Sequence, residues 1–517
     1  MKPGQLSYLQ ERAACGTGFI THLSARPSHA LVRDALSTVA RLAHRGAVSA
    51  DGRTGDGSGI LTQIPHKLFS RDLARHGITM PEDFAVGMFF IGRDDARARS
   101  IIEESLAARD VRLLAWRDAP IDLDALGEHA RRTRPDIAQA IIARPAHLDE
   151  NAFERALWLA RQVIERRARE EEACVYVASL SSRTIVYKGL FVAPQLPRFY
   201  RDLADPDFES ALALFHQRYS TNTFPTWERA QPFRMLCHNG EINTLQGNIA
   251  WMRAREAFFP AELSPVIDLT GSDSAMLDNA LELLTRAGRD IAHAAMMVMP
   301  EAWEKIADIS AELKSFYRYH ATMMEPWDGP AAVAFSDGRF VGMTLDRNGL
   351  RPARYLVTDD GLIVASSEAG ALEIDPARVI EKGKLGPGQM IVADLARGEL
   401  WRNDRVKNFY ASRAPYGEWL DAEMRVLNSN FQLQPLTSNL HAPRPMSNFK
   451  PPSVTPTKNS PSCSSRWRRT ARSRLVRWAM TRRTRFNRNL NDHCIIFSNS
   501  VSRKLRIRRL IHCAKNW

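Results

Sequence analysis

Residues 15–19, Cys-Gly-Thr-Gly-Phe, place a thiol just before a strand predicted over residues 18–23. Alternating glycines leave the backbone open, so a ligand could approach the thiol closely. A nucleophilic cysteine needs such access, but a buried structural cysteine is the commoner explanation of this short motif taken alone. Cys15 is therefore a candidate nucleophile whose role depends on the residues that accompany it.

The apolar pattern of the rest of the chain predicts a mixed α and β body. Strands and helices do not alternate regularly, so sheets packed face to face with helices outside are favoured over a doubly wound sheet. Asp-Gly pairs predict hairpin turns at residues 336–338 and 359–361. The predicted strands are residues 18–23, 59–64, 84–91, 175–180, 184–187, 211–215, 233–237, 331–335, 340–345, 354–357 and 362–366; the predicted helices are residues 30–43, 151–171, 245–257, 274–287 and 302–324.

A glycine-rich segment, residues 51–59, follows the sequence His44-Arg45-Gly46. Its spacing loosely resembles a phosphate-binding loop. No Gly-Lys-Ser/Thr follows it, and its glycines precede a strand, whereas those of a nucleotide-binding loop open a helix. We therefore exclude a nucleotide-binding loop at this position.

Three polar residues and a glycine could together bind an amino acid whose side chain carries an amide. Arg218 follows a predicted strand and could pair with a carboxylate, while Asp273 could receive an ammonium group. The turn at Asn239-Gly240 could direct a side-chain NH₂ and a backbone N–H at an oxyanion. Each also has a purely structural explanation: a surface arginine, a hairpin turn and the start of a helix.

The motifs occur in the order found in class II glutamine amidotransferases, and residues 8–424 resemble in particular the large subunits of glutamate synthases. That resemblance implies an α+β protein with the αββα four-layer sandwich of the N-terminal-nucleophile hydrolases. The motifs that carry it are Cys15-Gly-x-Gly-Phe19, His44-Arg45-Gly46, Arg218-Tyr219-Ser220-Thr221, Asn239-Gly240-Glu241, Ser272-Asp273 and residues 325–330, 346–352 and 415–419.

The resemblance implies that residues 1–14 are a leader, removed between Ala14 and Cys15. The new α-amine, with a reference pKa of about 7.7–8.0, could then act as the base for its own thiol. An internal cysteine, with a pKa of about 8.5 and no such neighbour, would be a poor nucleophile. Arg45 is implied to order the loop around the nucleophile.

The remaining roles are also implied by the resemblance. The Cys15 thiolate would attack the glutamine carboxamide, with the oxyanion held by Asn239 and the Gly240 N–H. Arg218 would hold the α-carboxylate of glutamine, and Asp273 its α-ammonium group. Ammonia would leave, and water would hydrolyse the glutamyl thioester.

Two further residues, Cys237 and His238, adjoin the Asn239-Gly240 turn and suggest a Cys–His pair. Adjacent residues of a strand face opposite ways, so we interpret both as structural.

Glutamate synthase large subunits are much longer than this chain, and their remainder carries an FMN-binding barrel and an iron–sulfur cluster. This sequence has no cysteine cluster for iron–sulfur, and its length leaves no room for an α/β barrel. The resemblance therefore implies no cofactor in this chain. It implies glutamine as the substrate and, for the full-length protein, a small NADPH-oxidising subunit as partner.

Positive charge is concentrated at the C-terminal end. Residues 425–517 contain 20 lysines and arginines and one acid, Asp492, whereas the whole chain has a formal charge of +13. One reading is a basic arm for nucleic acid. The other is a frameshift near residue 425, because codons permitted for residues 475–482 and 502–517 encode family-like peptides in a neighbouring frame. We expect residues 425–517 to be disordered or poorly folded.

No segment reaches the roughly 18 apolar residues that span a bilayer, and residues 1–14 lack an apolar signal region, so a cytoplasmic protein without membrane contact is expected. The expected domains are a leader over 1–14, an amidotransferase domain over 15–424 and a basic tail over 425–517. The expected function is glutamine hydrolysis for glutamate biosynthesis, with the synthase half missing. The alternative is a nucleic-acid-binding or regulatory protein that uses the tail.

Overall fold

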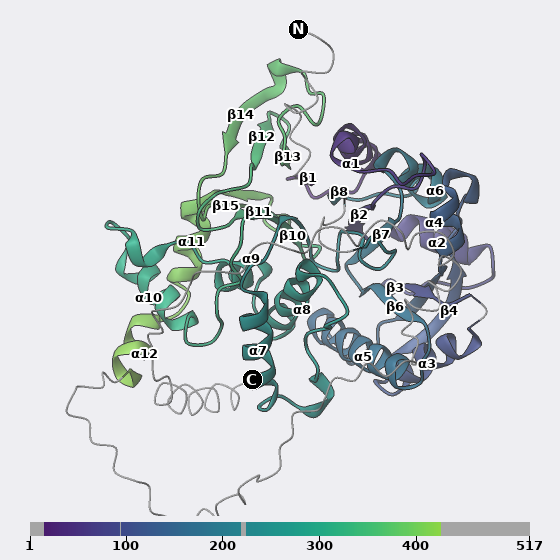
Figure 1. Ribbon diagram of the computed structural model, residues 1–517, viewed down its shortest axis with the longest axis horizontal. Helices are drawn as coiled ribbons and strands as arrows, with labels where there is room; N and C mark the ends of the chain where they lie inside the picture. The colour runs from purple at the N-terminus through teal and green to yellow at the C-terminus, as the bar shows by residue number, and fades with distance from the viewer. Residues whose placement is uncertain (1–14, 94, 219–223, 425–517) are drawn as a thin grey trace, which may run out of the picture.

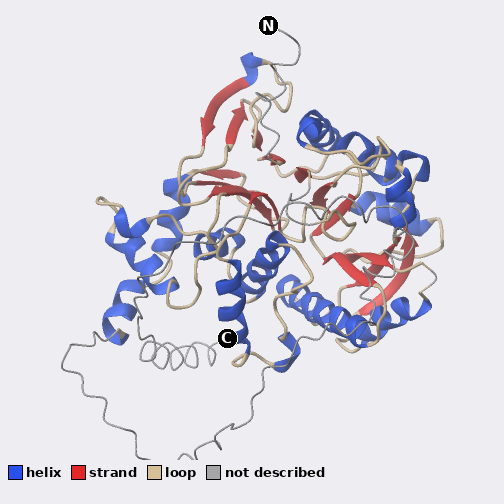
Figure 2. Cartoon of the chain, viewed as in Figure 1, coloured by secondary structure: helices blue, strands red, loops and turns tan. Residues whose placement is uncertain are grey.

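Two antiparallel sheets face each other at the centre of the protein (Figure 1, Figure 2). The computed structural model describes residues 15–93, 95–218 and 224–424. The seven-stranded sheet has the order β14-β12-β13-β1-β8-β2-β7, and the five-stranded sheet the order β16-β15-β11-β10-β9. The strands of the seven-stranded sheet are β1 (Gly16–His22), β2 (Ser58–Gln63), β7 (Thr184–Gly189), β8 (Leu212–Gln217), β12 (Arg354–Thr358), β13 (Leu362–Ser366) and β14 (Val379–Lys384). Those of the five-stranded sheet are β9 (Leu236–Gly240), β10 (Ala331–Ser336), β11 (Phe340–Leu345), β15 (Met390–Asp394) and β16 (Glu399–Trp401).

Alternating side chains of each strand enter two different cores. In β1, Phe19 joins the core between the two sheets, where it packs with residues such as Ala332 and Met343 of the opposite sheet. Its neighbour Ile20 joins the core on the outer face, under helix α1 (His29–Arg41). This alternation follows from the pleat of a strand, which directs successive side chains to opposite faces.

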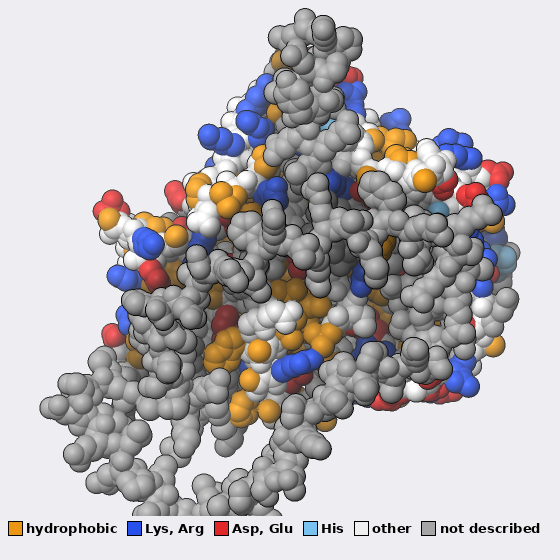
Figure 3. All heavy atoms as spheres, viewed as in Figure 1, with side chains coloured by type: hydrophobic (Ala, Val, Ile, Leu, Met, Phe, Trp, Pro, Cys, Tyr) orange, Lys and Arg blue, Asp and Glu red, His pale blue; other side chains and the backbone are white. Residues whose placement is uncertain are grey.

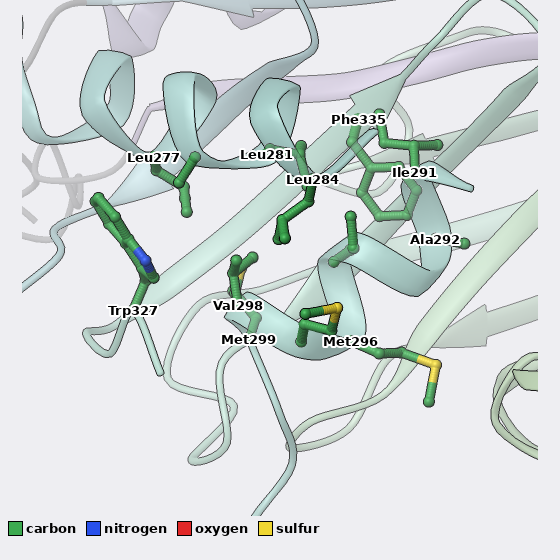
Figure 4. Close-up of a cluster of buried hydrophobic side chains, with 14 of the residues drawn as sticks. Leu277, Leu281, Leu284, Ile291, Ala292, Met296, Val298, Met299, Trp327 and Phe335 are labelled. Atoms are coloured by element: carbon green, nitrogen blue, oxygen red, sulfur yellow. The ribbon is translucent and has the colours of Figure 1, made fainter. Parts of the chain in front are cut away.

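Helices cover both outer faces. Helices α1 and α2 (His66–Ala74) pack on the seven-stranded sheet, and α8 (Asp273–Arg286), α9 (Ile291–Val298), α10 (Ala311–His320) and α11 (Asn403–Ala411) on the five-stranded one. Figure 4 shows Leu277, Leu281 and Leu284 of α8 gathered in the cluster that contains Val298 of α9 and Phe335 of β10. The resulting helix–sheet–sheet–helix order confirms the predicted α+β αββα sandwich. The remaining helices are α3 (Ala96–Ala107), α4 (Glu128–Thr133), α5 (Glu150–Glu170), α6 (Leu196–Phe199), α7 (Leu245–Glu256) and α12 (Tyr416–Glu423).

A third, four-stranded sheet was not predicted. Its order is β4-β5-β3-β6, with strands β3 (Phe84–Ile91), β4 (Arg112–Asp118), β5 (Asp136–Ala143) and β6 (Val175–Ser181). One face packs on α3 and α5, and the other joins the core beside β2 and β7. Strand β4 escaped prediction because charged residues bound its short apolar run, and β5 because an alanine-rich run has no clear period of two.

The prediction of a single helix over residues 302–324 is wrong. The structure has a short 3₁₀ turn at Trp303–Lys305 and a separate helix α10. Ser310 separates them, because its side chain accepts a hydrogen bond from Leu313 N and so begins a new helix.

Two buried histidines make the fold sensitive to acid. Nε2 of His293 lies 2.9 Å from Nε2 of His320, and Nδ1 of His320 lies 2.8 Å from Phe316 O. Burial lowers the pKa of His293 to about 2 and that of His320 to about 3. Both rings are therefore neutral in the folded protein, whereas both take up a proton in the unfolded chain below its reference pKa of about 6.5.

We expect the contribution of these two histidines to the free energy of unfolding to be constant above about pH 6.5 and to fall below it, by about 1.4 kcal/mol per pH unit for each histidine. The sign follows because the unfolded state binds more protons than the folded one in this range. Denaturant unfolding at pH 7.5 and pH 5 measures the slope. The variant H293N/H320N should lose this part of the slope, while a substitution of the exposed His76, H76Q, should retain it. Equal slopes in wild type and double variant would contradict the assignment.

Candidate active site

Cys15 lies immediately before β1, where the two facing sheets approach each other. Its backbone N–H donates to Oδ1 of Asn239 at 3.1 Å, which joins the start of β1 to the end of β9. The glycines of the motif serve packing. A Cβ on Gly16 would lie 2.6 Å from Cβ of Leu42, and one on Gly18 would lie 2.2 Å from Ala365 O. The interpretation of these glycines as an opening for a ligand is therefore wrong.

In the uncleaved chain, the surroundings of Cys15 strongly disfavour ionisation of its thiol. Burial raises the pKa of the Cys15 thiol to about 12, against the opposing effect of the Arg218 charge. Asp56 and Asp273 raise this pKa further, and Arg351 lowers it. The thiol is consequently protonated at neutral pH, and a nucleophilic role requires a base beside it.

Asn239 presents an unused hydrogen-bond donor next to Cys15. The side chain is 1% exposed, and its Oδ1 is occupied by the Cys15 N–H. Its Nδ2 is buried without a hydrogen-bond partner among the described residues. Buried amide groups are usually paired in folded proteins, so an unpaired NH₂ is a donor available to a ligand.

The next residue, Gly240, directs a backbone N–H away from the neighbouring strand. Its partner across the ladder is Ala331, whose N–H and C=O both engage Asp346, at 3.3 and 2.9 Å. The Gly240 N–H therefore points to the open edge of the five-stranded sheet. Only glycine suits this position, since φ is +143° and a Cβ would lie 1.7 Å from Pro330 O.

Arg218 directly follows β8 in an unusual backbone conformation. Its φ is +97°, and its N–H donates to Gly57 O at 2.9 Å. Such a conformation is costly for a residue with a Cβ and is retained where the surroundings impose it. Nη1 of Arg218 is buried without a hydrogen-bond partner among the described residues, so the guanidinium can still bind an anion. Residues 219–221 of the same motif lie outside the described residues.

Asp273 is the first residue of α8, after the helix cap Ser272. One carboxylate oxygen, Oδ2, accepts from Ile242 N at 2.9 Å, and the other, Oδ1, accepts from Ser274 N at 2.8 Å. The carboxylate is thus tied to the backbone that follows Gly240. A negative charge at this end of a helix is also favoured by the helix dipole.

Arg45 ends the 3₁₀ turn Leu42–Arg45 after α1 and forms an ion pair with Glu368. The same carboxylate lies 3.0 Å from Nε2 of His44. Glu368 follows Ser367, whose N–H donates to Thr17 O at 2.8 Å. Arg45 is thereby connected to the backbone of β1, two residues beyond Cys15.

Two charged residues near Cys15 were assigned no role from the sequence, Asp56 and Arg351, and both influence the pKa of its thiol. Arg351 donates from Nε to Pro330 O at 3.4 Å, which places it beside the Gly240 turn. The sequence feature that could have indicated Arg351 is Asp346. Its carboxylate accepts from Asn348 N and Leu350 N and so folds the loop between Asp346 and Arg351. An acid followed by Asn-Gly predicts such a turn, but not the position of Arg351 in space.

Cys237 and His238 face opposite ways, as expected. Sγ of Cys237 lies 2.9 Å from Oγ1 of Thr17, between the two sheets. Nδ1 of His238 lies 2.7 Å from Oγ of Ser274, on the side of α8. They do not form a Cys–His pair.

A cavity of about 710 Å³ lies away from this site. It is at the far end of β2, around Gln63, whereas Ser58 at the other end pairs with Gln217 of β8. Several charged side chains of its lining are already paired, such as Arg286 with Glu154 at 2.6 Å. We assign no ligand to it.

Two properties concern the described residues as a whole. In the part of the chain that the structure describes, no group of three or more histidine, cysteine and acidic side chains could hold a metal ion. None of the helices described there is both long and apolar enough to cross a bilayer.

The chain is similar in sequence to one family of known proteins over most of its length. Residues 15–419 match the family described as glutamine amidotransferases class-II. The chain is 43% identical over 430 residues to the glutamate synthase [NADPH] large chain of Bacillus subtilis (strain 168), covering 81% of this chain and 28% of that protein. It is 44% identical over 424 residues to the large chain of Azospirillum brasilense, covering 79% and 28%. It is 42% identical over 443 residues to ferredoxin-dependent glutamate synthase 2 of Synechocystis sp. (strain ATCC 27184 / PCC 6803 / Kazusa), covering 83% and 28%.

Proposed function

Because this chain belongs to the class II glutamine amidotransferases, we propose that it hydrolyses glutamine to glutamate and ammonia through a thioester on Cys15. The observation that carries the proposal is the double position of Asn239. Its Oδ1 accepts from the Cys15 nitrogen, while its Nδ2 is buried and unpaired among the described residues. One side chain thus touches the nucleophilic residue and keeps a donor for the developing oxyanion.

Activation would begin with removal of residues 1–14, which lie outside the described residues. Cleavage converts the Cys15 amide nitrogen into an α-amine with a reference pKa of about 7.7–8.0. The thiol, whose pKa burial raises to about 12, then has a base of its own, which takes the thiol proton as the sulfur attacks the substrate. Asn239 Oδ1 already accepts from this nitrogen and would hold the amine in place.

In the acylation step the sulfur of Cys15 bonds to the amide carbon of glutamine, and the carbonyl oxygen takes the negative charge. Asn239 Nδ2 and the Gly240 N–H would donate to this oxygen. When the oxyanion collapses, the C–N bond breaks and the leaving nitrogen takes the proton from the α-amine, so ammonia is released. The amine then removes a proton from water, which attacks the thioester, and the products are glutamate and the free thiol.

The substrate would be held at its other end by two charges. Nη1 of Arg218 is available for the α-carboxylate, and the Asp273 carboxylate for the α-ammonium group. Arg45, connected to β1 through Glu368, would order the backbone around Cys15. The charges of Arg218 and Asp273 both act on the Cys15 thiol, which supports binding of one substrate molecule by all three residues.

The chain spans 28% of the length of these three relatives, so what the rest of such a protein does is itself a proposal. We propose that ammonia released at Cys15 serves glutamate synthesis in that remainder, with FMN, an iron–sulfur cluster and a small NADPH-oxidising subunit. The cytoplasmic location and the domain boundaries 1–14, 15–424 and 425–517 stay predictions.

The alternative function, nucleic-acid binding or regulation, depends on residues 425–517, which lie outside the described residues. On the face shown in Figure 3, both acidic and basic side chains of the described residues are exposed.

The test is the purified full chain, with its N terminus determined by intact mass and its products measured together. We expect a mature protein that begins at Cys15 and releases glutamate and ammonia from glutamine in equal amounts. A variant in which residues 2–14 are deleted, so that the initiator methionine directly precedes Cys15 and can be removed, should be active without a processing step. A folded chain that begins at Cys15 and does not hydrolyse glutamine would overturn the proposal.

A further inference from the structure

A buried polar pair connects the strand of the oxyanion donors to the carboxylate of Asp273. His238, the residue before Asn239, is 1% exposed, and Ser274 in the first turn of α8 is 2% exposed. Nδ1 of His238 lies 2.7 Å from Oγ of Ser274, and this Oγ lies 3.3 Å from Oδ1 of Asp273. The three side chains form a continuous series from β9 to α8.

The positions of the protons follow from counting donors. Nε2 of His238 is buried without a hydrogen-bond partner among the described residues. An unpaired N–H at that atom would cost more than an unpaired lone pair, so the proton belongs on Nδ1. His238 Nδ1–H therefore donates to Ser274 Oγ, and the Ser274 hydroxyl donates to Asp273 Oδ1. The imidazole stays neutral, because burial lowers the pKa of His238.

The main chain of His238 is held from two sides as well. Its N–H donates to Oε1 of Gln231 at 2.8 Å, and its carbonyl lies 3.1 Å from Nε2 of His216. The ring is thus presented to Ser274 by a strand segment with little freedom. The same segment continues directly into Asn239 and Gly240.

We propose that His238 and Ser274 are positioning residues that fix the Asp273 carboxylate for the α-ammonium group of the substrate. This inference rests on the proposed function and concerns how the same site selects an α-amino acid. Two backbone N–H groups, of Ile242 and Ser274, already reach this carboxylate. The Ser274 hydroxyl adds a third donor, whose direction is set by His238. The oxyanion donors and the ammonium holder are thereby kept at a fixed separation.

The test compares two substrates that differ only at the group Asp273 would hold. Glutaramate is glutamine without its α-amino group, so Asp273 contributes nothing to its binding. For the full chain carrying S274A, loss of one hydrogen bond to the carboxylate should raise KM for glutamine by about tenfold and leave kcat within about twofold. KM for glutaramate should stay unchanged. A merely structural role of Ser274 would change both substrates alike.

Control variants separate positioning from helix stability. S272A removes the α8 cap, whose Oγ accepts from Ala275 N at 3.2 Å, and should lower stability. It should not change the ratio of KM for glutamine to KM for glutaramate. S274T keeps the hydroxyl and should restore the wild-type ratio. H238L should raise the ratio as S274A does, while H238N, which places an N–H where Nδ1 was, should preserve it.

The outcomes also distinguish this inference from the proposed function. A processed wild-type chain that hydrolyses neither substrate overturns the proposed function itself. If the wild type is active and the S274A and H238L variants raise KM for glutamine and KM for glutaramate by the same factor, only the positioning role is overturned. If S274A does not fold, the H238L and H238N pair decides the question by the same ratio.

Discussion

Replacing Cys15 with alanine should lower kcat for glutamine hydrolysis by about 10⁴-fold or more. No thioester can form without the sulfur, and the neighbouring donors of Asn239 and Gly240 have no attacking group to assist. Binding of glutamine should persist, because Arg218 and Asp273 are untouched. The measurement is ammonia release under saturating glutamine, together with glutamine binding by calorimetry.

The matched control is Cys237, whose buried thiol contacts Thr17 between the sheets. C237A removes a second thiol whose pKa burial raises to about 12, and it should leave kcat near that of the wild type. A C15A protein that still hydrolyses glutamine, or a C237A protein that loses activity while remaining folded, would contradict the assignment of the nucleophile.

The same residue offers a chemical readout of leader removal. In the uncleaved chain, where burial raises the pKa of Cys15 to about 12, iodoacetamide should react very slowly at pH 7.5, because alkylation requires the thiolate. In the chain that begins at Cys15, the α-amine should accelerate alkylation at this position. Peptide mass mapping compares the two forms directly.

Substituting Asn239 should produce the second largest loss, about 10²–10³-fold in kcat with KM changed only a few-fold. N239A removes both the Nδ2 donor and the acceptor for the Cys15 nitrogen. N239D is the sharper variant, because it retains an oxygen for that nitrogen and replaces the donor by a negative charge. If Nδ2 stabilises the oxyanion, N239D should lose at least as much kcat as N239A.

Asn279 supplies a control of the same residue type. It is 4% exposed, and its Oδ1 accepts from Asp268 N at 3.0 Å within the α8 region. N279A should lower the free energy of unfolding by about 1–3 kcal/mol, through an unpaired buried N–H, and leave kcat unchanged. Wild-type kcat in N239D would show that this side chain does not stabilise the transition state.

Much of the central sandwich was predictable because strand and helix patterns are local. The alternation in β1 and the Asp-Gly turn between β10 and β11 are encoded within a few residues. The third sheet was missed because β4 and β5 are stabilised by packing on α3 and α5 more than by their own composition. Strand propensity depends strongly on such surroundings.

For the site, the residue types and their order identified the candidates, but not their contacts. Arg218, Asn239 and Asp273 could be named because an amino-acid substrate requires complementary charges and a donor for an oxyanion. Arg351 could not, since its place beside Pro330 depends on how the loop folded by Asp346 meets the other sheet. The relation of Ser274 to His238 was equally invisible, because 36 positions separate them.

The motif at residues 15–19 separates what the sequence determines from what only the tertiary structure determines. Sequence by itself determined that a thiol stands at the start of a strand, and a family resemblance supplied its partners. Only the tertiary structure decided that the glycines pack against Leu42 and Ala365, and that the Cys15 nitrogen meets Asn239, 224 positions away. The physical reason is that alternation and turn chemistry act between neighbours in the chain, whereas burial, unpaired donors and the raised thiol pKa arise only when two sheets close on each other.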